Sequence, residues 1–164
     1  MPKLDPSLVA DLPFFAALQP SQVEDVLAAA RSLRVPKNKA VFEQGERAER
    51  FYLLLDGRLR VVRTTPDGRQ VVVRFIAPGE LFGVAMALRI GSYPGTAIAV
   101  TDSVALAWPN AVWPELVGKY PSLALDALQT VGGRLQEANT RILEMATEQV
   151  ERRIAHALLR LARQ

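Results

Sequence analysis

Between Pro36 and Trp108 the sequence consists of short apolar runs that alternate with residues typical of tight turns. Predicted strands cover residues 40–43, 51–55, 58–64, 70–76, 96–101 and 104–108. The turn residues between them are Gly45, Asp56-Gly57, Thr65-Pro66-Asp67-Gly68, Ala77-Pro78-Gly79 and Thr101-Asp102-Ser103. Gly adopts positive φ at little cost and Pro fixes φ, so these residues close turns between extended segments. Many short strands at this spacing predict an antiparallel sandwich or jelly roll, here a β-roll over 36–120.

Helical patterns flank this region on both sides. Residues 12–35 carry apolar positions at helical spacing, and Ser21 with Glu24 has the spacing of a capping box, so 1–35 is predicted to be a helical lead-in. After Trp108 the sequence predicts a helix around 111–119 and then a long helix from Pro121 to about Thr147. The protein is therefore predicted to be mainly β with flanking helices.

The long helix carries a heptad repeat. Leu128, Leu135 and Ile142 recur every seven residues, and a second set follows three positions later: Val131, Ala138 and Met145. This is the a/d pattern of a coiled coil and predicts a homodimer that pairs through 121–147, which we call the seam helix. The alternative is a helix that packs on the sheet, for which two apolar positions per heptad form a narrow stripe. The pair Gly132-Gly133 favours close approach by a partner backbone.

The last residues predict the beginning of a second domain. Polar residues interrupt the heptads around 147–150, and a new amphipathic helix is predicted after them, with Ile154 and Leu158 among its apolar residues. An apolar helix face at the end of a chain needs partners, so we expect the chain to end inside a domain that begins with 148–164.

Composition excludes several function classes. The 164 residues include no Cys and one His, which argues against disulfide scaffolds, thiol catalysis and the usual zinc cages. The net charge of +3 is too small to identify a nucleic-acid partner. No run is apolar enough to cross a membrane, and acidic residues at Asp5 and Asp11 are unlike a signal peptide. The sequence therefore predicts a cytoplasmic protein.

Four blocks of sequence, in order, resemble the CRP/FNR family of bacterial transcription regulators. They are Val41-Phe42-Glu43-Gln44-Gly45-Glu46, Phe51-Tyr52-Leu53-Leu54-Leu55-Asp56-Gly57, Pro78-Gly79-Glu80-Leu81-Phe82-Gly83 and Arg153-Ile154-Ala155-His156-Ala157-Leu158-Leu159-Arg160-Leu161-Ala162. The resemblance implies a cyclic-nucleotide-binding roll, a dimerisation helix and a winged helix-turn-helix that reads DNA. It makes 148–164 the first helix of a truncated DNA-binding domain, and the recognition helix would lie beyond Gln164.

The resemblance also places an effector site after the Pro-Gly turn. Family members that bind cyclic AMP have a Glu for the ribose and an Arg for the phosphate in this cassette. Here Val84 stands at the Glu position and Gly95 at the Arg position. Each lost contact is worth about 1.5–3 kcal/mol, so we expect no ordinary response to cyclic AMP. The predicted effector pocket is Gly79, Glu80, Leu81, Phe82, Gly83, Val84, Arg89, Gly95, Thr96 and Ala97.

The effector itself stays open at this point. Arg89 is the cation within the cassette and could meet a phosphate from another position, although a solvated surface Arg explains it better. Residues 84–88 are apolar, which suits haem or a filled core. The lack of Cys argues against an iron–sulfur cluster, and His156 is the one His for haem. Met86 or Tyr93 as an iron ligand is less well supported than a place in the core or surface.

Two other classes remain as alternatives. An enzyme of the cupin type needs several His around a metal, and a carboxylate hydrolase would have to use Glu43, Glu46 or Glu80, which the resemblance explains as turn and sheet-edge residues. We therefore predict that the protein is not an enzyme. The other alternative is a cyclic-nucleotide-like or dimerisation module without DNA binding, or a haem-based gas sensor of the same family.

Overall fold

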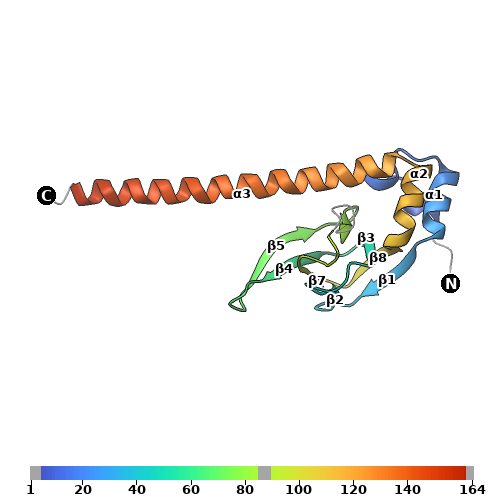
Figure 1. The fold of residues 1–164 in the computed structure, drawn as a ribbon, viewed down its shortest axis with the longest axis horizontal. Helices are drawn as coiled ribbons and strands as arrows, with labels where there is room; N and C mark the ends of the chain where they lie inside the picture. Colours follow the sequence, from blue (N-terminus) through green and yellow to red (C-terminus); the bar gives the residue numbers. More distant parts are fainter. Residues whose placement is uncertain (1–4, 85–89, 162–164) are drawn as a thin grey trace. The chain divides into compact units, whose positions relative to one another are not determined.

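The computed structural model describes residues 5–84 and 90–161, and the side chains of Leu8, Ala146 and 148–161 fall outside this description. The chain divides into two compact units, Met1–Ala127 and Leu128–Gln164. The first unit contains the strands, the short helices and the first turns of α3, and the described part of the second unit is the rest of α3 (Figure 1). Within the described residues no helix is long and apolar enough to span a membrane.

The first unit contains two four-stranded antiparallel sheets (Figure 1). The order of the first sheet is β1 (Arg31–Val35), β8 (Ser103–Pro109), β3 (Arg50–Asp56) and β6 (Leu81–Phe82). The order of the second sheet is β2 (Ala40–Phe42), β7 (Thr96–Ala99), β4 (Leu59–Thr64) and β5 (Gln70–Ile76). This arrangement confirms the predicted antiparallel jelly roll, and each of the six predicted strands has its counterpart.

The core lies between the two sheets. One hydrophobic cluster takes residues from both: Val35, Phe42, Tyr52, Leu54, Leu59, Ile76, Phe82, Tyr93, Ala97, Ala99, Ala105 and Ala107. Strand β3 has a run of four buried residues, so its opposite face is covered as well. There Trp108 stacks on Phe51 with ring centroids 5.2 Å apart and meets Phe14 edge-on. Its indole Nε1 donates to the Val26 carbonyl at 2.8 Å, which fastens α1 (Pro20–Ala28) to the first sheet.

The predicted helical lead-in is correct only in part. Short 3-10 helices, η1 (Pro6–Leu8) and η2 (Pro13–Phe15), precede α1, and the chain is then extended in β1. The prediction that the helix extends to residue 35 is wrong. Leu33 and Val35 lie in β1 and point toward the core with the two-residue period of a strand, and Leu33 pairs with Ala105.

The predicted cap of this helix is also wrong. Pro20 occupies the first helical position, so the cap falls on Gln19, whose N–H donates to Gln22 Oε1 at 2.8 Å, rather than on Ser21 with Glu24.

The helices after the roll follow the prediction closely at their beginnings. A 3-10 turn, η4 (Asn110–Val112), leads into α2 (Trp113–Lys119), and α3 (Ser122–Leu161) follows. Leu123 and Ala127 in its first turns are buried. The predicted interruption at 147–150 is wrong for the backbone, because α3 is continuous to Leu161.

Candidate effector site

The structure brings the two halves of the cassette into one core. Gly79 closes the turn between β5 and β6, with its N–H donating to the Leu54 carbonyl at 2.8 Å. Leu81 and Phe82 form β6 and are buried against β3. Ala97 lies on β7 in the opposite sheet, and both Phe82 and Ala97 belong to the same hydrophobic cluster.

Aromatic side chains fill the interior between these halves. Tyr93 stacks on Phe42 with ring centroids 3.8 Å apart, and Tyr52 stacks on Phe82 at 5.0 Å. The Tyr93 hydroxyl donates to the Arg50 carbonyl at 2.7 Å and accepts from the Arg50 N–H at 3.2 Å. Burial, assisted by a hydrogen bond with Tyr93, raises the pKa of Tyr52 well above its ordinary range. Tyr93 is thus a core residue, and its oxygen is occupied by the backbone.

The two positions that depart from the cyclic-AMP pattern are both enclosed. Val84 is 6% exposed, so a carboxylate there would need a buried partner. A Cβ atom on Gly95 would lie 2.9 Å from the Val62 carbonyl oxygen and 3.1 Å from Val61 Cγ1. Strand β4 therefore passes directly against the backbone at the position where the phosphate-binding Arg is expected.

Thr96 and Glu46 serve the neighbouring turn. Thr96 Oγ1 accepts from the Gln44 N–H at 3.0 Å, and Glu46 Oε2 accepts from the Glu43 N–H at 2.9 Å. The predicted role of Glu46 as a turn residue is in accord with this geometry.

One charged group near the cassette was not predicted from the sequence. Arg74 on β5 has a side chain that is only 16% exposed, and its Nη2 lies 2.6 Å from Glu80 Oε2. Glu80 Oε1 accepts from the Ala77 N–H at 3.3 Å, so this carboxylate joins the turn and the strand. In the sequence Arg74 looks like an outward polar residue of a strand. Its inward position follows from the pairing with Val61, which is a feature of the folded sheet and has no local signal in the sequence.

Several predicted site residues lie outside the described part. Arg89 and Met86 fall in residues 85–89, and the His156 side chain is likewise outside the description. Their predicted roles therefore stay predictions.

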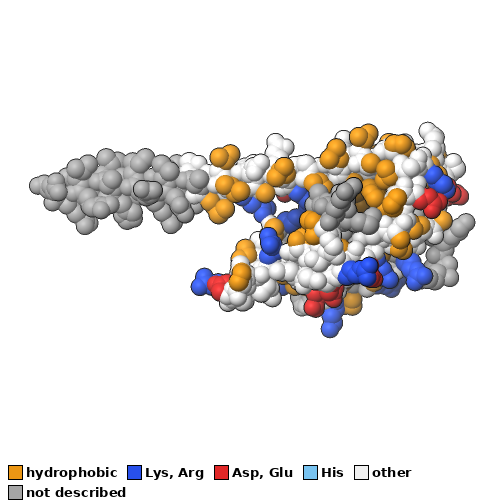
Figure 2. All heavy atoms as spheres, in the orientation of Figure 1, with side chains coloured by type: hydrophobic (Ala, Val, Ile, Leu, Met, Phe, Trp, Pro, Cys, Tyr) orange, Lys and Arg blue, Asp and Glu red, His pale blue; other side chains and the backbone are white. Residues whose placement is uncertain are grey.

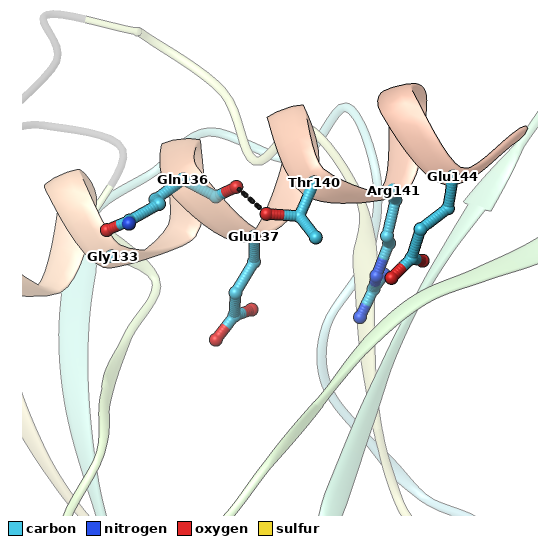
Figure 3. A pocket seen from close by; sticks show the side chains of 6 residues that line it. All are labelled: Gly133, Gln136, Glu137, Thr140, Arg141 and Glu144. Carbon is cyan, nitrogen blue, oxygen red and sulfur yellow. Dashed lines mark hydrogen bonds between the residues drawn. The ribbon is translucent and has the colours of Figure 1, made fainter. Parts of the chain in front are cut away.

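The seam residues of α3 are described, and most of them are open to solvent in the single chain. Leu128, Leu135, Ile142 and Met145 are 59–67% exposed, Ala138 is exposed and Val131 is half-buried. Apolar side chains stand out along the described part of this helix (Figure 2). Figure 3 shows a hollow beside α3 whose lining residues all lie outside the a and d positions. They are Gly133 and five polar residues, Gln136, Glu137, Thr140, Arg141 and Glu144. The helix is thus amphipathic in the register that the heptads predict.

Comparison with known proteins agrees with this architecture. The family model described as a cyclic nucleotide-binding domain matches residues 32–120, which is the roll with η4 and α2 and ends before α3. The fold and the cassette thus define a protein with a cyclic-nucleotide-binding roll. The Cyclic AMP receptor protein of Thermus thermophilus is 32% identical over 152 residues, covering 93% of this chain and 70% of that protein. The chain belongs to the CRP/FNR family of transcription regulators, as its sequence blocks predict.

Solved structures support the same assignment. The Catabolite Activator Protein of Thermus thermophilus superimposes with a TM-score of 0.75 at 32% identity, covering 93% of this chain and 71% of that chain. The sensor domain of the transcriptional regulator DNR from Pseudomonas aeruginosa gives 0.69 at 28% identity, with coverage of 82% and 90%. The chain is therefore similar both to a longer regulator and to an isolated sensor domain.

Proposed function

We propose that this chain is the effector-sensing and dimerisation portion of a cytoplasmic, non-catalytic DNA-binding regulator that does not respond to cyclic AMP. The observation that carries the proposal is the exposed apolar seam of α3, which follows directly on a cyclic-nucleotide-binding roll. A contiguous apolar stripe of this kind needs a partner, and a/d heptads are typical of self-pairing helices. The matched residues make up 70% of the relative from Thermus thermophilus, so that protein is longer than the part that this chain matches.

In this mechanism, an effector near residues 79–97 changes how the two seam helices pack. The DNA-binding domains then move into or out of register with half-sites one helical turn apart. A switch from 1:99 to 99:1 needs an effector that binds one state about ten-thousand-fold better, equivalent to about 5.5 kcal/mol.

The proposed loss of cyclic-AMP sensing rests on Val84 and Gly95. Both positions are enclosed, and neither offers the carboxylate or guanidinium of the cyclic-AMP cassette. Calorimetry with cyclic AMP and cyclic GMP tests this, and micromolar binding of either would overturn it. An absorption spectrum after stoichiometric haem addition tests the gas-sensor alternative, for which a Soret band is the positive result.

The dimer is tested by sedimentation of variants on two faces of α3. Leu135→Glu combined with Ile142→Glu places charges in the seam and should give monomers. Leu143→Glu is the matched control, because Leu143 is 67% exposed, compared with 64% for Leu135, but lies outside the a and d positions. A dimeric double variant would refute the proposed interface.

DNA binding is tested on the gene. The reading frame past the codon for Gln164 should encode a helix-turn-helix with a basic recognition helix. If it does not, the chain acts as a sensor or dimerisation module without DNA, and this part of the proposal is wrong.

A further inference from the structure

An almost buried Arg side chain lies beside the effector cassette, on β5, the strand that leads into the Pro-Gly turn. Arg74 is 16% exposed, whereas Arg69 on the same hairpin is 83% exposed. Burial of a charge has a high desolvation cost, and a buried ion pair is weak evidence for a stability role. A function in binding explains the position of Arg74 better than stability alone.

The register places Arg74 on the same inner face as the cassette. Ala97, Val61 and Arg74 are aligned neighbours on β7, β4 and β5. Adjacent strands lie about 4.8 Å apart, so the Arg74 backbone is about 10 Å from that of Ala97, across Val61. Val61 Cγ1 is also the atom that a Cβ on Gly95 would approach to 3.1 Å. Arg74 therefore places a guanidinium on the other side of β4 from Gly95, which stands at the position of the phosphate-binding Arg.

The contact between Arg74 and Glu80 involves one nitrogen of the guanidinium and one oxygen of the carboxylate. Glu80 gives Oε2 to Arg74 Nη2 at 2.6 Å, while its Oε1 accepts from the Ala77 N–H. A carboxylate or phosphate that brings two oxygens could instead make the bidentate pair for which a guanidinium is shaped. Glu80 is 42% exposed, so the carboxylate that would have to give way is open to solvent.

We propose that Arg74 is the anion-binding residue of the effector site and that the effector is a small organic anion, a carboxylate or a phosphate, which replaces Glu80 at the guanidinium. This inference rests on the proposed sensing function and names the chemical class of its ligand. Glu80 then acts as an internal competitor that neutralises Arg74 while the site is empty.

The test is calorimetry on the full 164-residue chain with glutarate, inorganic phosphate and cyclic AMP as separate probes. Glutarate or inorganic phosphate should bind, and the one that does distinguishes a carboxylate from a phosphate ligand. Cyclic AMP should not bind, as the proposed function requires. Arg74→Gln should weaken that binding by about tenfold to a hundredfold, the range for a charge-assisted hydrogen bond, and Arg74→Lys should weaken it less. Glu80→Gln should strengthen it, because the competing charge is removed while the amide oxygen can still accept from the Ala77 N–H.

The control is the exposed ion pair of the same hairpin, in which Arg69 Nε lies 3.0 Å from Asp67 Oδ2. Arg69→Gln and Asp67→Asn should leave binding unchanged. If the Arg74–Glu80 pair is purely structural, both variants lower the unfolding temperature. In that case the two variants do not change binding in opposite directions. That result, or no binding of glutarate or inorganic phosphate to the wild-type chain and to Glu80→Gln, would overturn the proposal.

Sedimentation of the same samples separates this failure from failure of the proposed function. If the chain is dimeric and binds no probe, the anion site is wrong and the dimer stands. If the chain is monomeric and yet binds through Arg74, the dimerisation proposal is wrong and the anion site stands.

Discussion

Gly83 is the cassette position where one added methyl group should have the largest effect. Its φ is +67°, and a Cβ there would lie 2.8 Å from Tyr52 Cδ2 and 3.3 Å from Phe42 Cε1. Gly45 has a similar φ of +87° with nothing within 4 Å of such a Cβ. Gly83→Ala therefore combines backbone strain with overlap, whereas Gly45→Ala has backbone strain alone.

The expected free energies follow from these two contributions. Left-handed backbone costs a non-Gly residue about 1–2 kcal/mol. Overpacking a close-packed core costs about 1–3 kcal/mol. We therefore expect Gly45→Ala to lower the free energy of unfolding by about 1–2 kcal/mol and Gly83→Ala to lower it by about 2–5 kcal/mol. The effect of Ala on the unfolded chain is similar at the two sites and cancels in the comparison.

Urea unfolding followed by the fluorescence of the two Trp residues, of which Trp108 is buried, measures this difference. The same pair of substitutions in a Tyr52→Leu background isolates the overlap, because the ring nearest to Gly83 is then absent. In that background the cost of Gly83→Ala should approach that of Gly45→Ala. Equal costs of the two alanines in the wild-type background would refute the packing described around Gly83.

Three further outcomes are expected in the first unit. Trp108→Phe removes the donor to the buried Val26 carbonyl and should lower the free energy of unfolding by about 1–3 kcal/mol in urea titrations. Burial raises the pKa of Tyr52, so the folded protein holds the phenolic proton of Tyr52 more tightly than the unfolded chain does. The protonated Tyr52 therefore contributes to the stability of the fold fully below about pH 10, and this contribution is lost as the pH rises further. Tyr52→Phe should therefore flatten the fall in urea midpoint between about pH 8 and about pH 11. Gly95→Ala should destabilise the roll by about 1–3 kcal/mol through contact with the Val62 carbonyl, and an unchanged thermal midpoint would contradict that contact.

Turn chemistry made most of the roll predictable from sequence. Gly57, Gly68 and Gly79 all adopt positive φ where the sequence predicts turns, and the strands between them follow. The two strands that the sequence missed have physical reasons. β6 has two residues, too short for any period, and β1 is an edge strand whose single fully buried residue is Val35.

The apolar face of α3 and the proposed anion site differ in how local their sequence signals are. The heptads are local, so Leu128, Leu135 and Ile142 could be predicted as one face of a helix. Arg74 and Glu80 are six positions apart, but what makes them notable is burial and the register with Val61, which depends on strand pairing across the sheet. Local periodicity thus predicts the apolar face of a helix better than it predicts the position of a side chain that depends on strand pairing.

The absence of an Arg at position 95 and the presence of Arg74 are physically connected. Gly95 lets β4 pass within contact distance of its backbone, which sets Val61 between Gly95 and Arg74. A guanidinium at position 95 would push β4 away and add a second positive charge near the first, and like charges in a partly buried site oppose each other. Glu80 neutralises one guanidinium, since it offers one oxygen to Arg74 and keeps the other for the turn. The geometry therefore favours a site with a single cation on β5, and an effector recognised there would approach from the side of Glu80.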